Sequence, residues 1–193
     1  MRAFYVSVLA ALAVAASGLV LRSVAGAASV GEPSKVESPY RGQQTRAIKA
    51  LSPQQIDDYL NGRGLGYAKA AELNHYPGPR HVLDLAGELE LTSRQTDKSQ
   101  LIFAAMNAEA VALGKRLVEK ESELDQQFAN ESIDESSLRE LLTEIGGLEA
   151  ELRYVHLSAH LKQKALLTGR QVHIYDRLRG YGMPHATGHD HNH

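Results

Sequence analysis

Two consecutive segments carry long apolar stripes at helical spacing, and they constrain the fold more than any other feature. In residues 95–128 the stripe repeats every eleven residues, or three helical turns, through Ile102, Met106, Leu113, Leu117, Leu124 and Phe128. In the next segment it follows an unbroken heptad pattern through Leu138, Leu141, Ile145, Leu148, Leu152, Val155 and Ala159. A short, mainly polar break at residues 129–134 separates them, and neither helix can bury its stripe alone. The sequence therefore predicts a long antiparallel helical hairpin.

Shorter helices are expected on both sides of the hairpin. Ser52, Pro53 and Gln55 form a helix-start signal, which predicts a helix over residues 54–74 that is weakened by three glycines. A second short helix is predicted over residues 80–89. No segment alternates polar and apolar residues over a useful length, so the predicted fold class is all-α, without a sheet.

The second long segment has more apolar surface than one hairpin can cover. Tyr154, Leu157 and Leu161 lie at helical spacing on a face turned away from the heptad seam. Such a helix needs a second partner, either the N-terminal helices or another copy of the chain. We expect both, with the second copy forming a homodimer. The alternative is that these are ordinary exposed apolar residues.

The N-terminal part predicts an exported protein. Residues 1–28 have a short basic start, an apolar run and the small-residue site Ala25-Gly26-Ala27, which is typical of a signal peptide; the alternative is an uncleaved inner-membrane anchor. Polar residues 29–51 are interpreted as a flexible tether, residues 52–181 as the helical domain, and residues 182–193 as a disordered histidine-rich tail. The expected location is the periplasm.

Composition narrows the function. The chain has no cysteine, which excludes disulfides, thiolate metal sites and cysteine nucleophiles. Its 21 basic and 23 acidic residues give no basic excess for binding nucleic acid. No nucleophile elbow, phosphate loop or zinc-protease motif occurs, so we expect no enzymatic activity. Any transition-metal site must use imidazole, carboxylate or methionine.

A five-residue element occurs twice, once before each of two predicted helices. It reads Leu-Thr-Ser-Arg-Gln at residues 91–95 and Leu-Thr-Gly-Arg-Gln at residues 167–171. In each copy the threonine can cap the helix while the glutamine reaches back to the cap amide, with the leucine as the staple residue. One such copy predicts only a helix start.

Two Leu-Thr-x-x-Gln copies flanking a long exported hairpin resemble the CpxP/Spy family of periplasmic chaperones and its metal-resistance relatives ZraP and CnrX. The resemblance covers roughly residues 52–181. It implies an all-α fold, a dimer and no enzymatic activity. Spy-like members hold unfolding clients on a basic cradle, whereas CnrX-like members sense nickel or cobalt and ZraP-like members bind zinc. This chain differs from Spy-like members in being acidic.

A histidine pair favours the metal-binding branch. His156 and His160 are four residues apart on the second long helix, so both rings can approach one ion of Zn, Ni, Co or Cu. CnrX-like members combine such a pair with His and Glu from an N-terminal helix. The resemblance therefore implies Glu72 and His75 as remote ligands, with His81 as second choice. The alternative is two helix-surface histidines in ordinary hydrogen bonds.

The C-terminal tail carries a second histidine group. The group comprises His185, His189, His191 and His193. Without periodicity, this segment is expected to chelate divalent metals only loosely, because binding must order it. The alternative is an inert terminus. The sequence thus supports two hypotheses: a periplasmic metal sensor or buffer that reports to a membrane-bound signalling partner, and an ATP-independent chaperone for unfolded clients.

Overall fold

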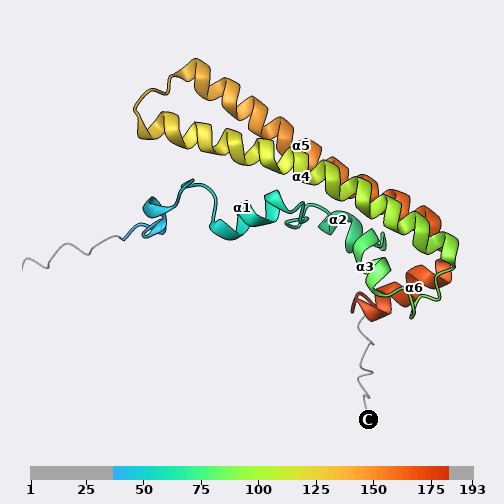
Figure 1. Ribbon diagram of the computed structural model, residues 1–193. Coiled ribbons are helices and arrows are strands. Elements are labelled where there is room, and N and C mark those ends of the chain that lie inside the picture. Colours follow the sequence, from blue (N-terminus) through green and yellow to red (C-terminus); the bar gives the residue numbers. More distant parts are fainter. Residues whose placement is uncertain (1–36, 183–193) are drawn as a thin grey trace, which may run out of the picture. The chain divides into compact units, whose positions relative to one another are not determined.

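The computed structural model describes residues 37–182, and within them every regular element is helical. This confirms the all-α prediction and the absence of a sheet in that range. The elements are η1 (Gln43–Thr45), α1 (Pro53–Leu60), α2 (Lys69–Glu72), α3 (Pro79–Asp84), α4 (Ser93–Ala129), α5 (Glu135–Leu166) and α6 (Gly169–Leu178). Figure 1 shows α4 and α5 packed side by side as an antiparallel hairpin, with the shorter helices along one side and at one end.

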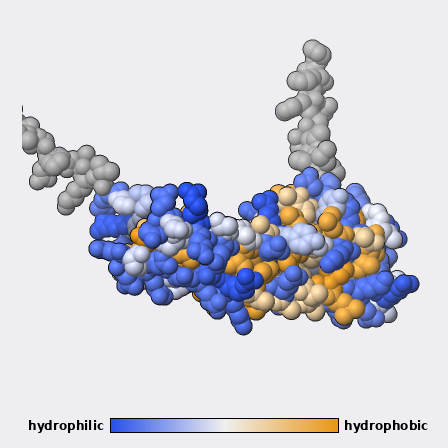
Figure 2. All heavy atoms as spheres, turned by 90° about the horizontal axis from the view of Figure 1, so that it is seen from above, coloured by the Kyte–Doolittle hydropathy of each residue, from blue (hydrophilic) through white to orange (hydrophobic). Residues whose placement is uncertain are grey.

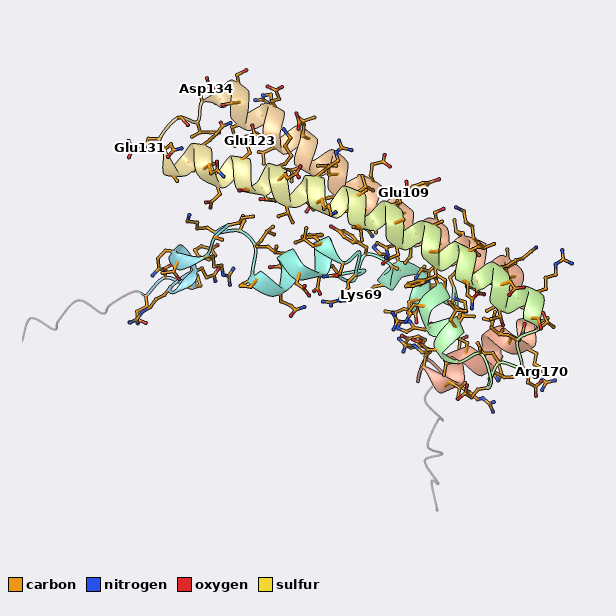
Figure 3. The ribbon with its side chains drawn as sticks, viewed as in Figure 1. Lys69, Glu109, Glu123, Glu131, Asp134 and Arg170 are labelled. Carbon is orange, nitrogen blue, oxygen red and sulfur yellow. The ribbon has the colours of Figure 1, made fainter. Side chains whose placement is uncertain are left out.

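The hairpin forms as the apolar stripes predict. Six of the seven α5 seam residues are buried, and Leu138 is half-buried. Asp134 caps α5 through its carboxylate and the Ser137 backbone N–H, at 2.8 Å. Figure 3 labels Glu131 and Asp134 at this turn and Arg170 at the opposite end of the hairpin. The turn and the cap therefore begin α5 close to where the sequence placed it.

On α4 the buried positions are mostly small residues, and of the predicted stripe Leu117 alone is buried. Ala110 and Gly114 are buried, whereas Phe128 is 55% exposed. The reason is that α1 crosses α4 here: a Cβ on Gly114 would lie only 2.2 Å from the Tyr59 carbonyl oxygen. A helix packed between two neighbours needs a small-residue face as well as a large-residue face.

The tether predicted over residues 29–51 is wrong for its C-terminal part. Ile48 and Leu51 are buried in the same core as Tyr59 and Leu117. The Lys49 backbone N–H also donates to the Asp125 carboxylate at 2.9 Å, and its ammonium forms an ion pair there at 2.8 Å. Two apolar side chains and one charged anchor are enough to fix this segment along α4. Residues 29–36 lie outside the described residues.

The helix predicted over residues 54–74 is divided. The Ser52 capping box and the proline at the first helical position start α1 as predicted, but the helix ends at Leu60. Gly62, Leu65 and Gly66 all have positive φ, which a right-handed helix cannot include. The loop they form leads to the single turn of α2. Similarly, the helix predicted over residues 80–89 is shorter in the structure, as α3 ends at Asp84.

The two Leu-Thr-x-x-Gln elements contact each other. Both form the predicted capping boxes, at Thr92 and Thr168. Their glutamine side chains also pair: Gln95 Nε2 donates to Gln171 Oε1 at 2.9 Å, and Gln171 Nε2 donates to Gln95 Oε1 at 3.2 Å. This pair joins the start of α4 to the start of α6, beside a second core formed by Val82, Leu89 and Tyr175.

Some apolar surface remains uncovered. Tyr154 and Leu161 are 68% and 59% exposed, and Leu101 on α4 is 71% exposed. Figure 2 shows the apolar surface gathered over the half of the hairpin nearer α3 and α6. No helix within residues 37–182 is long and apolar enough to cross a membrane; the predicted signal or anchor at residues 1–28 lies outside this range.

Candidate functional site

A pocket of about 480 Å³ lies between the hairpin and the loop, α2 and α3 segments beside it. The α5 side contributes both members of the predicted histidine pair, His156 and His160. The other side contributes Glu72, the last residue of α2, and His81 in α3. Four of the five candidate ligands in the described range therefore line one pocket.

His160 is oriented by a backbone carbonyl. Its Nδ1 lies 2.6 Å from the Tyr76 carbonyl oxygen. Because a carbonyl only accepts, Nδ1 carries the proton, and in the neutral ring Nε2 then has the lone pair. The Lys164 ammonium lies 3.7 Å from the centre of the Tyr76 ring and further fixes this turn. Metal-binding histidines are commonly held in this way, with one nitrogen donating to a carbonyl and the other free to ligate.

Glu72 approaches both His160 and His81. Its Oε2 lies 3.6 Å from His160 Nδ1, and its Oε1 lies 3.7 Å from His81 Nδ1. The 3.7 Å between Glu72 Oε1 and His81 Nδ1 is close to the roughly 3.4 Å that separates two donors bound to one tetrahedral zinc at about 2.0–2.1 Å. The 3.6 Å contact to His160 involves its protonated Nδ1 and is not such a pair. A Cβ on Gly78 would lie 3.1 Å from His160 Nε2 and 3.4 Å from Glu72 Oε2, so the free nitrogen and this oxygen border the same space.

His156 is the most deeply buried of the candidate ligands. It is 4% exposed, and its ring stacks on Tyr67 with centroids 6.1 Å apart. Its Nε2 is buried without a hydrogen-bond partner among the described residues. Burial lowers the pKa of His156, and the neighbouring His160 lowers it further. Burial and the Arg179 charge likewise lower the pKa of His81. Both rings are therefore neutral at pH 7, the form that binds metals.

His75 does not line the pocket. The chain has φ 65° at this residue, and its Nδ1 lies 2.8 Å from Asp176 Oδ2 on α6. The structure therefore does not bring His75 together with Glu72 in the pocket, whereas the second choice, His81, lines it. The tail residues His185, His189, His191 and His193 lie outside the described residues.

Four basic residues line the pocket beside the single carboxylate of Glu72, and two of the four have carboxylate partners nearby. Arg63 pairs with Asp57 and Asp58 at 2.6 and 2.7 Å, and Arg80 pairs with Asp84 at 3.2 Å. Lys69, labelled on α2 in Figure 3, also lines the pocket. Because the Arg63 and Arg80 guanidinium groups have carboxylate partners, they repel an incoming cation less than free charges would.

Sequence reasoning missed the α6 side of the site. Glu72 Oε1 accepts from Tyr175 Oη at 2.5 Å and from Tyr181 Oη at 3.3 Å, and it lies 3.4 Å from Arg179 Nε. Burial and the Glu72 hydrogen bond raise the pKa of Tyr175. The only available signal was the four-residue spacing of Tyr175 and Arg179 on the helix after the second repeat, which does not identify a contact about one hundred residues away.

The candidate ligand atoms lie near one another in the pocket, but they do not converge on a single position. Among residues 37–182, no three His, Asp or Glu side chains already form a metal-binding group. Ligation by His160, Glu72 and His81 would require side-chain rotations. Comparisons of the chain with protein-family models, curated proteins and solved structures found no match. The resemblance to the CpxP/Spy family therefore stays a prediction.

Proposed function

We propose that this protein binds a divalent transition metal in the pocket and acts in the periplasm as a metal sensor or buffer. His160 and Glu72 are the central ligands, with His81 and, after rotation, His156 completing the set. One observation carries the proposal: His160 donates Nδ1–H to the Tyr76 carbonyl while its free Nε2 borders the same space as Glu72 Oε2. An orienting second bond of this kind is typical of metal-binding histidine.

The donor set limits the class of metal. Imidazole and carboxylate without thiolate suit Zn²⁺, Ni²⁺, Co²⁺ and Cu²⁺, and their affinities are expected to follow the Irving–Williams order. The low pKa of His156 and His81 supports binding near neutral pH, because no proton must first be displaced from these rings. In a sensing role, a membrane-bound partner would recognise the metal-bound form of the protein.

Calorimetric titration of the full chain with each ion tests the proposal. The tail histidines are replaced by glutamine in every protein, so that only the pocket is measured. We expect His81→Gln and Glu72→Gln each to weaken binding about tenfold or more, because each removes a ligand. His75→Gln is the matched control, since His75 faces Asp176 outside the pocket. Equal affinity in all variants, or no binding by the parent, would refute the pocket site.

A second candidate function is supported by the uncovered apolar face. Leu101 and Tyr154 border a surface groove of about 270 Å³ between α4 and α5, and exposed apolar patches often mark binding surfaces. A chaperone role predicts that the protein suppresses light scattering by a denaturing client, and that Leu101→Lys with Tyr154→Lys abolishes the effect. Scattering at the control rate, with and without Zn²⁺, would exclude this role.

A further inference from the structure

The two oxygens of Glu72 face different parts of the molecule. Oε2 borders the space beside Gly78 and His160, whereas Oε1 is held by side chains of α6 and the residues after it and lies 3.7 Å from His81 Nδ1. Resting on the proposed metal-binding function, we infer that Tyr175 is a positioning residue that holds Glu72 for the metal, and that metal binding and the docking of α6 therefore favour each other.

Tyr175 is suited to this role by its burial and its hydrogen bonds. Its side chain is fully buried and packs in the second core with Val82 and Leu89. The Gly78 backbone N–H donates to the Tyr175 hydroxyl at 3.4 Å, so the hydroxyl is left to donate to Glu72 at 2.5 Å. One hydroxyl thus contacts both the carboxylate and the glycine that bounds the space for an ion.

Arg179 supports the same carboxylate but acts in two opposing ways. Its Nε lies 3.4 Å from Glu72 Oε1 and attracts that oxygen. Its positive charge also lines the pocket and repels a cation. Removing Arg179 would therefore change two effects of opposite sign. Removing the Tyr175 hydroxyl changes orientation without changing charge, which makes it the informative substitution.

The coupling follows from thermodynamic linkage. Tyr175 fixes Glu72 only while α6 is docked against α3 and the α2 turn. If a metal ion binds more tightly to the fixed carboxylate, then bound metal must favour docked α6 by the same factor. Tyr175 is part of α6, so the C-terminal helix becomes the element that responds to occupancy. This gives the proposed sensor a defined output, at the end of the hairpin marked by Arg170 in Figure 3.

The variant arm of the test compares Tyr175→Phe with Tyr59→Phe in the chain with tail histidines replaced. Tyr59 is another buried tyrosine, whose hydroxyl contacts Tyr67 rather than Glu72. Co²⁺ is the probe, because its visible spectrum reports its ligands. We expect Tyr175→Phe to weaken Co²⁺ binding about tenfold and to change the spectrum, while Tyr59→Phe leaves both unaltered. Melting curves in chelator verify that both variants fold.

The second arm uses the parent protein alone. Hydrogen exchange of residues 169–178 is measured with and without saturating Zn²⁺, and we expect slower exchange with zinc. Suppose that the parent binds metal. If Tyr175→Phe then has the parent's Co²⁺ affinity and spectrum, or if Zn²⁺ does not change the hydrogen-exchange rate of α6, the inference is overturned while the metal site stands. If the parent binds no metal, the proposed function fails and the inference fails with it.

Discussion

At the scale of single residues, the absence of a side chain at position 78 gives His160 and Glu72 a common space. Gly78 has φ −83°, a conformation open to any residue, so backbone freedom does not explain the glycine. The limited space around residue 78 explains the glycine, because an added Cβ would lie 2.9 Å from His160 Cε1 and 3.4 Å from Glu72 Oε2. Gly78 therefore matters because it leaves the space between His160 and Glu72 unfilled.

Gly78→Ala is therefore expected to reduce metal affinity about tenfold or more. The added methyl group would displace the oriented His160 ring, and we expect this to weaken binding as much as losing the hydrogen bond that orients a metal-binding histidine. Calorimetric titration with Zn²⁺ measures the change. Gly87→Ala is the control, because no atom lies within 4 Å of its added Cβ. Undiminished affinity in Gly78→Ala would mean that the ion does not occupy the space beside this residue.

His156 makes the stability of the metal-free protein depend on pH. Its pKa in the folded protein is lowered from about 6.5, chiefly by burial. As pH falls through 6.5 the unfolded chain takes up a proton that the folded chain resists, so the free energy of unfolding decreases. We expect a decrease between pH 7 and pH 5 in urea unfolding with chelator. His156→Gln should reduce the slope, leaving the part due to His81; an unchanged slope would contradict the assignment.

At the scale of elements, local chemistry was predictable and long-range pairing was not. The capping boxes at Thr92 and Thr168 depend on residues three apart, so the sequence contains the whole signal. The long helices were likewise predicted by their own periodicity. The pairing of Gln95 with Gln171 joins residues 76 positions apart, and no periodic pattern in the sequence indicates it. The same limit explains why Tyr175 was missed and why His75, which lies outside the pocket, was grouped with Glu72.

The glutamine pair is expected to contribute more stability than a helix cap alone. Gln171 caps α6 at Thr168, and its Nε2 also donates to the buried Leu89 carbonyl at 3.1 Å. Gln171→Ala should lower the unfolding free energy by about 2–3 kcal/mol, because a buried acceptor is left unsatisfied. Gln55→Ala, which removes a local capping-box bond of α1, should cost about 1 kcal/mol.

A double-mutant cycle then isolates the pairing. Gln95 also donates to the Leu166 carbonyl at 2.8 Å, so each glutamine has a bond that the other does not share. Denaturant unfolding of Gln95→Ala, Gln171→Ala and the double variant should give a double loss smaller than the sum of the single losses, since the shared bonds can be lost only once. Strict additivity would show that the two repeats are energetically independent.

At the scale of the whole molecule, the sequence predicted the hairpin but underestimated what packs against it. Residues 40–51 are polar on average, and this average does not reveal the two apolar side chains that pack in the core, Ile48 and Leu51. The small-residue face of α4 at Ala110 and Gly114 is equally inconspicuous in a search for large apolar residues. Together these features place α1, and hence the loop that forms one wall of the pocket.

The packed N-terminal segment makes a prediction that a flexible tether would not. Ile48→Ala and Leu51→Ala should each lower the unfolding free energy by roughly 2–4 kcal/mol, the range for truncating a buried aliphatic side chain. Leu142→Ala, at a leucine that is 51% exposed on α5, should change it by less than about 1 kcal/mol. Urea unfolding of the three variants measures this difference. If all three were equally neutral, the segment would be a tether after all, and α1 would lie against α4 without its help.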